Sequence, residues 1–554
     1  MQGQQQRFER QAKGPFLPTE ILHTRVLIVG AGPVGLALAA ELGWRGVACS
    51  IIEQSDGVIH HPRATAVNAR SMEFFRRWGV ADLVREAGTP PNFPHTVLFV
   101  TSLQGFEIAR IERPGHGGTR PTETSPERPQ RCNQLWLDPI LRDLASGFSC
   151  VTLRYRWRFE SFIEEQDGVL ATVRDLASDD VRTIAAEYLV DCSGGHSAIR
   201  EFLGIAMMGT PDIDYHLSIF VRAPELWKHH DKGKAALIHF IAAQGPRRNL
   251  VLLDGRELWR FGVTGKEFHD DPERVDANRL FDEVAGAATP REIISIRRWS
   301  ARDVVANKYR VGRVFLAGDA AHLNHPDGGF GLNTGIGDVA DLGWKLSAVL
   351  EGWGGAHLLD SYASERRPVG VRNVRQAEEN LQIKKRRPTE PAIADDTAEG
   401  AEARSRMREA ILRDSLRNYV TDGTALGYCY DPSPICWDDG SPPVADTITE
   451  YRPSSRPGSR APHAWLADGR STLDLFGRGF TLLRVGDDPP APDSIAAAFA
   501  RRVPLSIEQI REPLVRSIYE RRLVLVRPDG HVAWRSNDLP DDPLALADRV
   551  RGAA

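Results

Sequence analysis

The sequence predicts an α/β protein with an open, doubly wound parallel sheet, a second sheet domain interleaved with it and a smaller α/β domain at the C-terminal end. Three observations predict this class. Residues 25–52 read as a buried strand, a helix and a second buried strand, the order of a parallel sheet. Short apolar strands of the same type follow at 187–192 and 313–316. Between them, 217–298 holds alternating strands and one helix, which indicates a second domain.

The hydrophobic pattern gives the elements in chain order. A strand at 25–30, a helix at 34–42 and a strand at 47–52 open the chain. Next come helices at 72–78 and 81–87, a mixed layer of short strands at 90–124, a helix at 134–145 and a hairpin within 151–173. That hairpin turns at Gln166-Asp167-Gly168, since an Asp-Gly pair favours a tight turn.

The second half is read in the same way. The expected elements are strands at 236–242 and 249–253, a helix near 279–287, a strand at 313–316, a helix at 333–350, a strand at 480–485, a helix at 493–500 and a strand at 523–527. Segment 388–406 is acidic and rich in Ala and Glu, which favours a mobile or partly disordered stretch.

Length and composition exclude several classes of protein. The 554 residues suffice for about three domains, or two large ones. Lys+Arg 70 against Asp+Glu 74 leaves a net charge of −4, which argues against a nucleic-acid-binding protein. The longest apolar run, 26–40, contains three glycines and a proline and is shorter than the roughly 20 residues of a membrane span. We expect neither a nucleic-acid nor a membrane partner.

The N-terminus and the cysteines favour a cytoplasmic protein. Residues 1–23 lack the apolar centre of a secretory signal, and we expect a loosely attached arm there. The six cysteines are scattered without a Cys-x-x-Cys pair, which favours reduced thiols over a disulfide framework or a zinc site.

The first chemical motif is Gly30-x-Gly32-x-x-Gly35, between the first strand and the first helix. Gly30 permits a tight turn, Gly32 lets the backbone approach a pyrophosphate, and Gly35 allows the helix to pack closely on the strand. Glu53 ends the next strand and can bond the hydroxyls of an unphosphorylated ribose, which favours FAD or NAD over NADP. The alternative is a glycine-rich turn without any nucleotide.

A longer motif at 312–346 reads GRVFLAGDAAHLNHPDGGFGLNTGIGDVADLGWKL. With the trailing segment 359–368, it resembles the pattern of the FAD-dependent aromatic hydroxylases, the single-component flavoprotein monooxygenases. Segment 61–73 resembles the same family's PRA…NxRxME stretch, and Gln134 matches a family glutamine. The resemblance spans about residues 24–545.

This resemblance implies a Rossmann-type domain that holds FAD without a covalent bond. The residues that match the family's FAD contacts are Gly30, Gly32, Pro33, Val34, Gly35, Glu53, Gln54, Arg63, Gln134, Gly318, Asp319, Pro326, Gly329, Gly331, Leu332 and Asn333. By the same resemblance, Asp319 binds the ribityl chain, the backbone of 328–333 faces the flavin edge, and Pro326 lies near the reactive C4a atom.

The polar residues of the same loop allow a second interpretation. Asp319, His322, His325 and Asp327 have the residue types of a metal site. The flavin pattern accounts for all of these positions except His325, so no metal is expected. His325 is either a group on the substrate side or an ordinary loop residue.

One segment departs from the family pattern. Where the family has strand-x-Asp-Gly-x-x-Ser-x-x-Arg, implicated in both FAD and NAD(P)H binding, Ser193 takes the place of the aspartate. Asp191 lies on the same side of the strand and could compensate in part. The departure puts the handling of the reductant in doubt.

Four residues are candidates for the chemistry: His216, His239, Arg260 and Pro326. A histidine can take a phenol proton near neutral pH, and Arg260 lies in a strand like one of the family's. Tyr215 is a further polar candidate. For each one, a structural hydrogen bond or a surface position is the alternative.

The resemblance also divides the chain. The expected parts are an N-terminal arm at 1–23, an FAD-binding domain at 24–90, 130–205 and 299–385, a substrate-binding α+β domain at 91–129 and 206–298, a helical or mobile connector at 386–446, and a thioredoxin-like domain at 447–554. That last domain resembles the tail of the phenol and 2,4-dichlorophenol hydroxylase branch. No cysteine follows Cys436, which excludes a dithiol role for it. The resemblance implies a homodimer.

The implied function is hydroxylation of a phenolic substrate, ortho to an existing hydroxyl. In the family, NAD(P)H reduces FAD, O2 adds at C4a, and the flavin hydroperoxide transfers its distal OH to the ring. The alternative on the same scaffold is tailoring of a larger polyketide-type ring by hydroxylation, epoxidation or Baeyer–Villiger insertion. From other classes, an NAD-dependent dehydrogenase and a non-catalytic FAD-binding protein stay open; Ser193 favours the latter.

Overall fold

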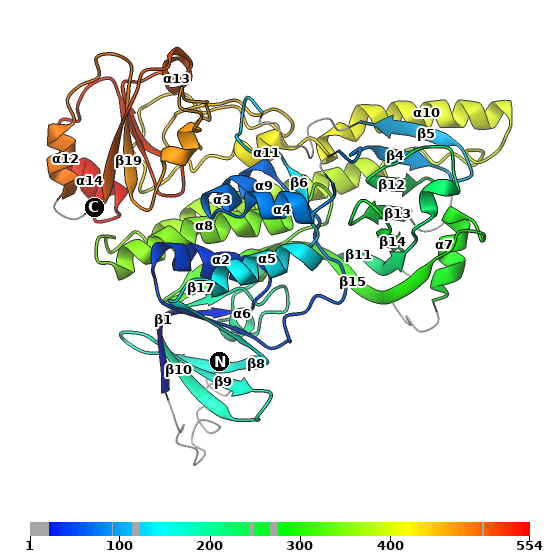
Figure 1. Cartoon of the computed structure of the whole chain (residues 1–554), viewed down its shortest axis with the longest axis horizontal. Coiled ribbons are helices and arrows are strands. Elements are labelled where there is room, and N and C mark those ends of the chain that lie inside the picture. The colour runs from blue at the N-terminus through cyan, green and yellow to red at the C-terminus, as the bar shows by residue number, and fades with distance from the viewer. Residues whose placement is uncertain (1–20, 91, 113–121, 244–246, 266–274, 501–502) are drawn as a thin grey trace.

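A computed structural model describes residues 21–90, 92–112, 122–243, 247–265, 275–500 and 503–554. The chain forms two large sheets, a smaller sheet near the C-terminus and a layer of helices between them (Figure 1). The predicted α/β class is confirmed. Of the expected N-terminal arm, 1–20 lies outside the described residues, and Ile21 already begins the first strand. Among the described helices, none is long and apolar enough to cross a membrane.

The first sheet contains the β-α-β unit that the sequence predicts. Its strand order is β16-β17-β10-β1-β2-β7, and the hairpin β8–β9 joins it through β9. β1 runs parallel to both β10 and β2. The strands are β1 Ile21–Val29, β2 Cys49–Glu53, β7 Val151–Tyr155, β8 Trp157–Glu164, β9 Val169–Asp175, β10 Val181–Asp191, β16 Arg310–Val311 and β17 Val314–Leu316.

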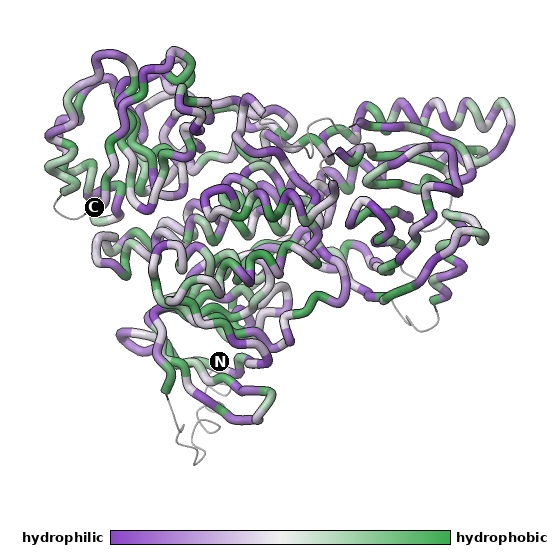
Figure 2. Tube along the Cα trace, in the orientation of Figure 1, coloured by the Kyte–Doolittle hydropathy of each residue, from purple (hydrophilic) through white to green (hydrophobic). Residues whose placement is uncertain are grey.

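A layer of helices covers this sheet, and apolar residues concentrate where the two meet (Figures 1 and 2). The helices of this part are α2 Pro33–Arg45, α3 Ala69–Arg77, α4 Ala81–Ala87, α5 Gln134–Ser146, α6 Ala198–Phe202, α8 Gly331–Leu350 and α9 Asp360–Lys385. α2 packs against α8 so closely that a Cβ on Gly335 would come within 2.6 Å of Val34. The N-terminal turns of both helices therefore meet at one place.

The second sheet separates an apolar core from a polar face. Its order is β18-β15-β11-β14-β13-β12-β4-β5. The strands are β4 Val97–Val100, β5 Glu107–Ile111, β11 Met207–Arg222, β12 Leu237–Phe240, β13 Arg247–Leu252, β14 Leu258–Thr264, β15 Glu292–Ala306 and β18 His322–Leu323. Trp259 and Phe261 are buried in the core with helix α7, Ala277–Ala285. Since side chains alternate along a strand, Arg260 between them faces the opposite way.

The smaller sheet is mixed, with the order β20-β19-β21-β22 and β19 parallel to β20. Its elements are β19 Phe480–Val485, α12 Asp493–Ala500, β20 Leu505–Ile510, α13 Pro513–Tyr519, β21 Leu523–Val526, β22 Val532–Ser536 and α14 Pro543–Val550. Trp344 of α8 is fully buried in the same apolar cluster as Phe480. A two-stranded sheet pairs β3, Ala66–Val67, with β6, Gln130–Arg131.

Two expectations about local structure were wrong. Residues 151–155 belong to the parallel sheet as β7, because Arg156 takes a left-handed conformation (φ 59°) that separates them from the hairpin β8–β9. Segment 388–406, expected to be mobile, leads into helix α10, Ala398–Asp414, which Thr397 caps. Met407 and Ile411 of that helix pack against β5, so tertiary burial outweighs the polar composition. Helix α11 follows at Asp422–Leu426.

The C-terminal sheet makes stability depend on pH through His531. This side chain is 0% exposed, and its burial lowers its pKa from 6.5 to about 3. The folded state therefore holds it neutral, and stability falls as the pH drops below 6.5, where the unfolded chain takes up a proton. At about pH 5 we expect a loss near 2 kcal/mol from this group. Urea unfolding between pH 7 and 5 should show a flatter pH dependence for His531→Gln; an unchanged slope would exclude His531 as a cause.

Candidate active site

One cavity of about 1500 Å³ joins the two large sheets. Its lining includes the carboxyl ends of β1 and β2, the loop 324–333 and the polar face of the second sheet. Ordinary small-molecule pockets measure roughly 300–1,000 Å³, so this one can hold a dinucleotide together with a second ligand.

The glycine motif forms one end of the cavity. Gly30 has φ +102°, and a Cβ there would lie 2.5 Å from the Cys192 carbonyl oxygen. A Cβ on Gly35 would lie 1.9 Å from the Gly30 carbonyl oxygen, so this glycine lets the helix pack on the turn. At Gly32, by contrast, a Cβ would have no protein atom within 4 Å. The backbone there is open to the cavity, as a bound pyrophosphate requires.

Glu53 is held at the end of β2 beside this turn. Its carboxylate accepts hydrogen bonds from the backbone N–H of Ala31 (3.0 Å) and of Ser55 (2.8 Å). Gly32, the N-cap of α2, offers no side-chain cap, so the first N–H groups of the helix stay available for an anion.

A tight loop precedes α8 at the middle of the cavity. The Gly329 N–H donates to the Pro326 carbonyl (3.1 Å), and Gly328 and Gly329 both have positive φ, +100° and +69°. The Asn333 side chain donates to the Gly329 carbonyl (2.7 Å) and accepts from the Asn68 N–H (2.9 Å). Because Asn333 ties the loop to the start of α3, its side chain positions the loop.

Asp319 and Gln134 face the space between these two ends. Both line the cavity, and enclosure by the surrounding protein raises the pKa of Asp319. The Gln134 Oε1 atom is buried without a hydrogen-bond partner among the described residues. An unpartnered buried amide oxygen is costly, and a ligand that donates a hydrogen bond would satisfy it.

The structure brings nearly all predicted site residues into this cavity. Those that line it are Gly30, Gly32, Pro33, Val34, Glu53, Gln54, Arg63, Gln134, His216, His239, Arg260, Asp319, Pro326, Gly329, Gly331, Leu332 and Asn333. Gly35 and Gly318 do not line it. Gly318 instead lies against Val34 of α2, where a Cβ would come within 3.0 Å.

Asp191 does not replace the aspartate missing at Ser193. It is fully buried, and its carboxylate accepts hydrogen bonds from the Ser193 hydroxyl (2.6 Å) and the Ser197 hydroxyl. Ser193 lines the cavity, but Asp191 does not. The acid therefore fixes the turn after β10 and leaves Ser193 as the exposed group.

The two candidate histidines are neutral hydrogen-bonding groups. Burial, followed by the charges of His325 and Arg260, lowers the pKa of His216 to about 3. Burial and Lys384 lower that of His239 to about 3 as well. His239 is already bonded to the Tyr419 hydroxyl (2.8 Å), whereas the His216 Nε2 atom has no partner among the described residues. His216 can accept a hydrogen bond from a substrate but holds a proton poorly.

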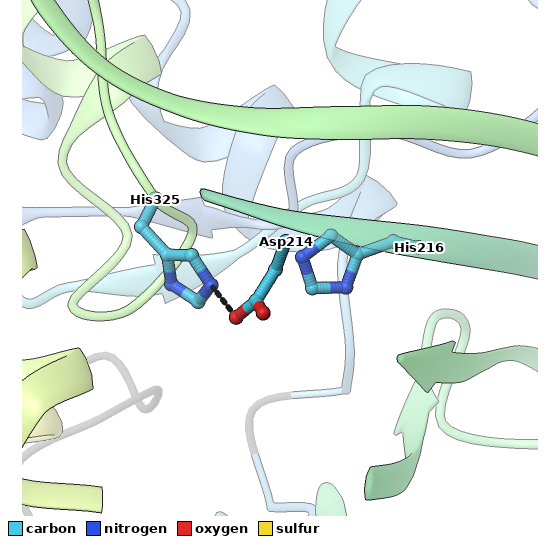
Figure 3. A group of neighbouring side chains, drawn as sticks. All are labelled: Asp214, His216 and His325. Atoms are coloured by element: carbon cyan, nitrogen blue, oxygen red, sulfur yellow. Dashed lines mark ion pairs between the residues drawn. The ribbon is translucent and has the colours of Figure 1, made fainter. Parts of the chain in front are cut away.

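His216 also belongs to a cluster with Asp214 and His325 (Figure 3). One ligand atom from each lies within 4.8 Å of the others, which is the arrangement of a possible metal site. However, Asp214 already pairs with Arg247 at 2.5 Å and with His325 at 3.8 Å. Since Arg247 neutralises the only carboxylate of the three, the cluster has little affinity for a cation.

The metal set suggested by the sequence is also divided. The His322 Nε2 atom bonds Asp338 of α8 at 2.8 Å, and both side chains are buried. His325 contacts Asp327 at 3.2 Å, and Asp327 pairs with Lys384. His322, His325 and Asp327 are therefore each engaged by another side chain, and only Asp319 of the four faces the cavity without such a contact among the described residues.

Sequence reasoning missed several residues of the second-sheet end. Arg131, Asn249 and Trp299 line the cavity, and the Trp299 ring stacks on His216 at 4.1 Å. Arg131 lies three residues before Gln134, which matches a family glutamine, so its closeness in sequence to that residue could have indicated it. Asn249 and Trp299 reach the cavity only through strand pairing, which no local pattern predicts.

These observations fit FAD. An open glycine turn, an acid at the end of β2, uncapped helix starts at α2 and α8, and the unpartnered Gln134 oxygen together suit an adenosine, a pyrophosphate and a flavin ring.

Comparison with known families gives the same assignment. A family model described as FAD binding domain matches residues 23–377, and one described as aromatic-ring hydroxylase, C-terminal, matches 454–554. The chain is 33% identical to a tetracenomycin A2 monooxygenase-dioxygenase of Streptomyces glaucescens, over 93% of this chain and 94% of that protein. It is 32% identical to a 4-methyl-5-nitrocatechol 5-monooxygenase of a Burkholderia species, over 95% and 96%.

Solved structures support the same family assignment. The rebeccamycin biosynthetic enzyme RebC with reduced flavin matches with a TM-score of 0.89 and 40% identity, over 97% of this chain and all of that one. Another structure of RebC contains 7-carboxy-K252c after soaking with chromopyrrolic acid.

Proposed function

The chain belongs to the FAD-dependent aromatic-ring hydroxylases, and from this premise we propose that it uses NAD(P)H and O2 to hydroxylate an aromatic ring of a multi-ring natural product. The observation that carries the proposal is the cavity of about 1500 Å³, which connects the glycine turn after β1 with the polar face of the second sheet. FAD, when bound, supplies the redox and oxygen-transfer chemistry.

The chain's own residues bind the cofactor and orient the substrate ring. The turn at Gly32, Glu53 and Asp319 hold the cofactor, and the loop 326–331 sets the position of its ring. The second sheet forms the wall of the cavity opposite that loop, where an aromatic ring can lie against it. His216 offers a neutral acceptor for a ring hydroxyl, which raises electron density on the ring without a full proton transfer.

The relatives favour a multi-ring substrate. One is a tetracenomycin A2 monooxygenase-dioxygenase, and a matching structure is that of the rebeccamycin biosynthetic enzyme RebC. A simple phenol is the second candidate, supported by the nitrocatechol monooxygenase and by a 2,4-dichlorophenol 6-monooxygenase of Cupriavidus pinatubonensis.

A substrate panel separates the two candidates. Oxidation of NADH and of NADPH should be measured in air with single-ring phenols and with three- to five-ring phenols, and the products identified. We expect stimulation with hydroxylated product from the multi-ring compounds. Stimulation by single-ring phenols alone would favour the second candidate, and the comparison of coenzymes would identify the reductant. Sedimentation of the same sample tests the homodimer that the family resemblance implies.

Asp319→Ala should lose bound flavin. Removing the carboxylate removes a hydrogen-bond acceptor inside the cavity, so we expect FAD affinity to fall by about tenfold or more. Asp360→Ala, at the exposed start of α9, is the matched control and should keep its flavin. Flavin absorbance after gel filtration is the measurement. Equal retention in both variants would remove Asp319 from the site.

A further inference from the structure

Arg260 is a cation of the cavity wall without an acidic partner. It is the third residue of β14 and lines the cavity on the polar face of the second sheet. One guanidinium nitrogen donates to the Asn249 Oδ1 atom at 3.0 Å. Among the described residues, no carboxylate forms an ion pair with it. Burial lowers the pKa of Arg260 to about 10, which still leaves it charged at neutral pH.

The neighbouring strand is shaped to hold this side chain. Asn249 of β13 is the register partner of Gly262 on β14, two residues beyond Arg260. A Cβ on Gly262 would come within 2.9 Å of the Asn249 Oδ1 atom. Because glycine leaves that space free, the Asn249 amide can turn toward Arg260 and fix its direction.

Arg131 is a second cation without an acidic partner in the same cavity. It is 6% exposed, donates to the Leu252 carbonyl at 3.3 Å, and has no hydrogen-bond partner at Nε. Burial, followed by the charge of Arg260, lowers its pKa to about 10. Nothing in the described chain neutralises either guanidinium group. Two buried like charges are costly unless a negative group comes between or beside them.

The other polar groups near them do not compensate. His61 is neutral, because burial and nearby arginines lower its pKa to about 4, and its ring nitrogens bond Ser295 and Ser218. The acids that lie toward the second sheet are already paired: Asp214 with Arg247 and Asp327 with Lys384. The cavity therefore has a positive subsite on the second sheet.

We propose that Arg260 and Arg131 bind an oxyanion of the second ligand, specifically a carboxylate carried by the aromatic substrate. The planar guanidinium groups match carboxylate geometry, and a hydrogen bond to a charged group is worth more than a neutral one. This inference rests on the proposed function for the identity of the ligand as the substrate. A phosphate of the nicotinamide coenzyme has the same chemistry and is the competing source.

The test compares two probes that differ only in charge. Anthracene carboxylate and anthracene carboxamide should be titrated into the FAD-loaded protein, with the flavin absorbance and fluorescence as readout. We expect the carboxylate to bind about ten- to hundredfold more tightly than the amide. Arg260→Gln should abolish that preference, and Arg260→Lys should keep part of it. Arg131→Met provides a second variant if Arg260→Gln fails to fold.

The matched control is Arg302→Gln. Arg302 lines the same cavity but pairs with Asp212 at 3.5 Å, so its loss should leave the preference for the carboxylate unchanged. Equal affinity for both probes in the parent protein, or an unchanged preference in Arg260→Gln, would overturn the subsite.

A second arm identifies the source of the anion. NADH and NADPH should be titrated into the same variants without an aromatic probe. Loss of coenzyme binding in Arg260→Gln, with the probe preference intact, would assign the subsite to coenzyme phosphate and overturn the proposal. The binding measurements do not depend on turnover. If the protein prefers the carboxylate probe but hydroxylates no compound, the proposed function is wrong and the anion subsite is still supported.

Discussion

Arg527→Met should reduce the free energy of unfolding by about 3–5 kcal/mol, the cost of breaking a buried ion pair by removing one partner. Arg527 follows β21 and is 0% exposed. It donates to both oxygens of Glu365 (2.6 and 2.9 Å), to Asp341 (3.0 Å) and to Asp529 (2.7 Å). Its removal leaves three buried carboxylates with Lys345 as the main remaining cation.

This cluster of charged side chains joins the C-terminal sheet to α8 and α9. Loss of the Arg527 side chain should therefore destabilise the sheet and the two helices together. Domain stability is typically 5–15 kcal/mol, and the expected change is a large part of it. Arg522→Met is the control, because Arg522 lies one residue before the same strand but is half exposed and bonds Asp538 at 3.3 Å. Urea unfolding measures both. Equal stability of the two variants would contradict a buried network at this interface.

Gly32→Ala should abolish tight FAD binding while the apoprotein keeps its stability. Gly32 has φ −73°, which alanine adopts without strain, and a Cβ there meets no protein atom within 4 Å. The methyl group would instead occupy the place where the backbone approaches the pyrophosphate. We expect FAD affinity to fall by at least about a hundredfold, or about 2.7 kcal/mol.

The control for this variant is Gly477→Ala. Gly477 also has open space around a Cβ and no positive φ, but it lies in the C-terminal domain, away from the cavity lining. Equilibrium dialysis of the apoproteins with FAD, with thermal unfolding beside it, separates binding from folding. If Gly32→Ala binds FAD as tightly as Gly477→Ala, the pyrophosphate does not lie at this turn.

The positions of the glycine turn and of Glu53 at one end of the cavity could be predicted because their signals are local. Gly30, Gly35 and Glu53 are determined by one turn, one helix contact and one strand end, all within 24 residues. Because the backbone of a β-α-β unit takes only a few conformations, the residue types at these positions predict its geometry.

The second-sheet end of the cavity was predicted poorly because it depends on pairing between distant strands. The binding role proposed for Arg260 depends on Asn249 of the neighbouring strand and on Arg131, which lies 129 residues earlier in the sequence. His239 was a candidate for the chemistry with a structural hydrogen bond as the alternative, and the structure shows such a bond to the Tyr419 hydroxyl. Asp191 could have compensated in part for Ser193, yet it is fully buried and bonds the Ser193 hydroxyl within its own turn. Side-chain partners of this kind are set by tertiary structure, not by local pattern.

The most direct test of flavin-dependent hydroxylation is turnover under isotopically labelled O2. The FAD-loaded protein should be incubated with NADH or NADPH and a multi-ring phenol, and the product examined by mass spectrometry. Hydroxylation by this route predicts a product that carries one labelled oxygen atom per coenzyme oxidised, and no product from Gly32→Ala protein without flavin. Coenzyme oxidation that yields only hydrogen peroxide with every ring compound, or labelled product without FAD, would contradict it.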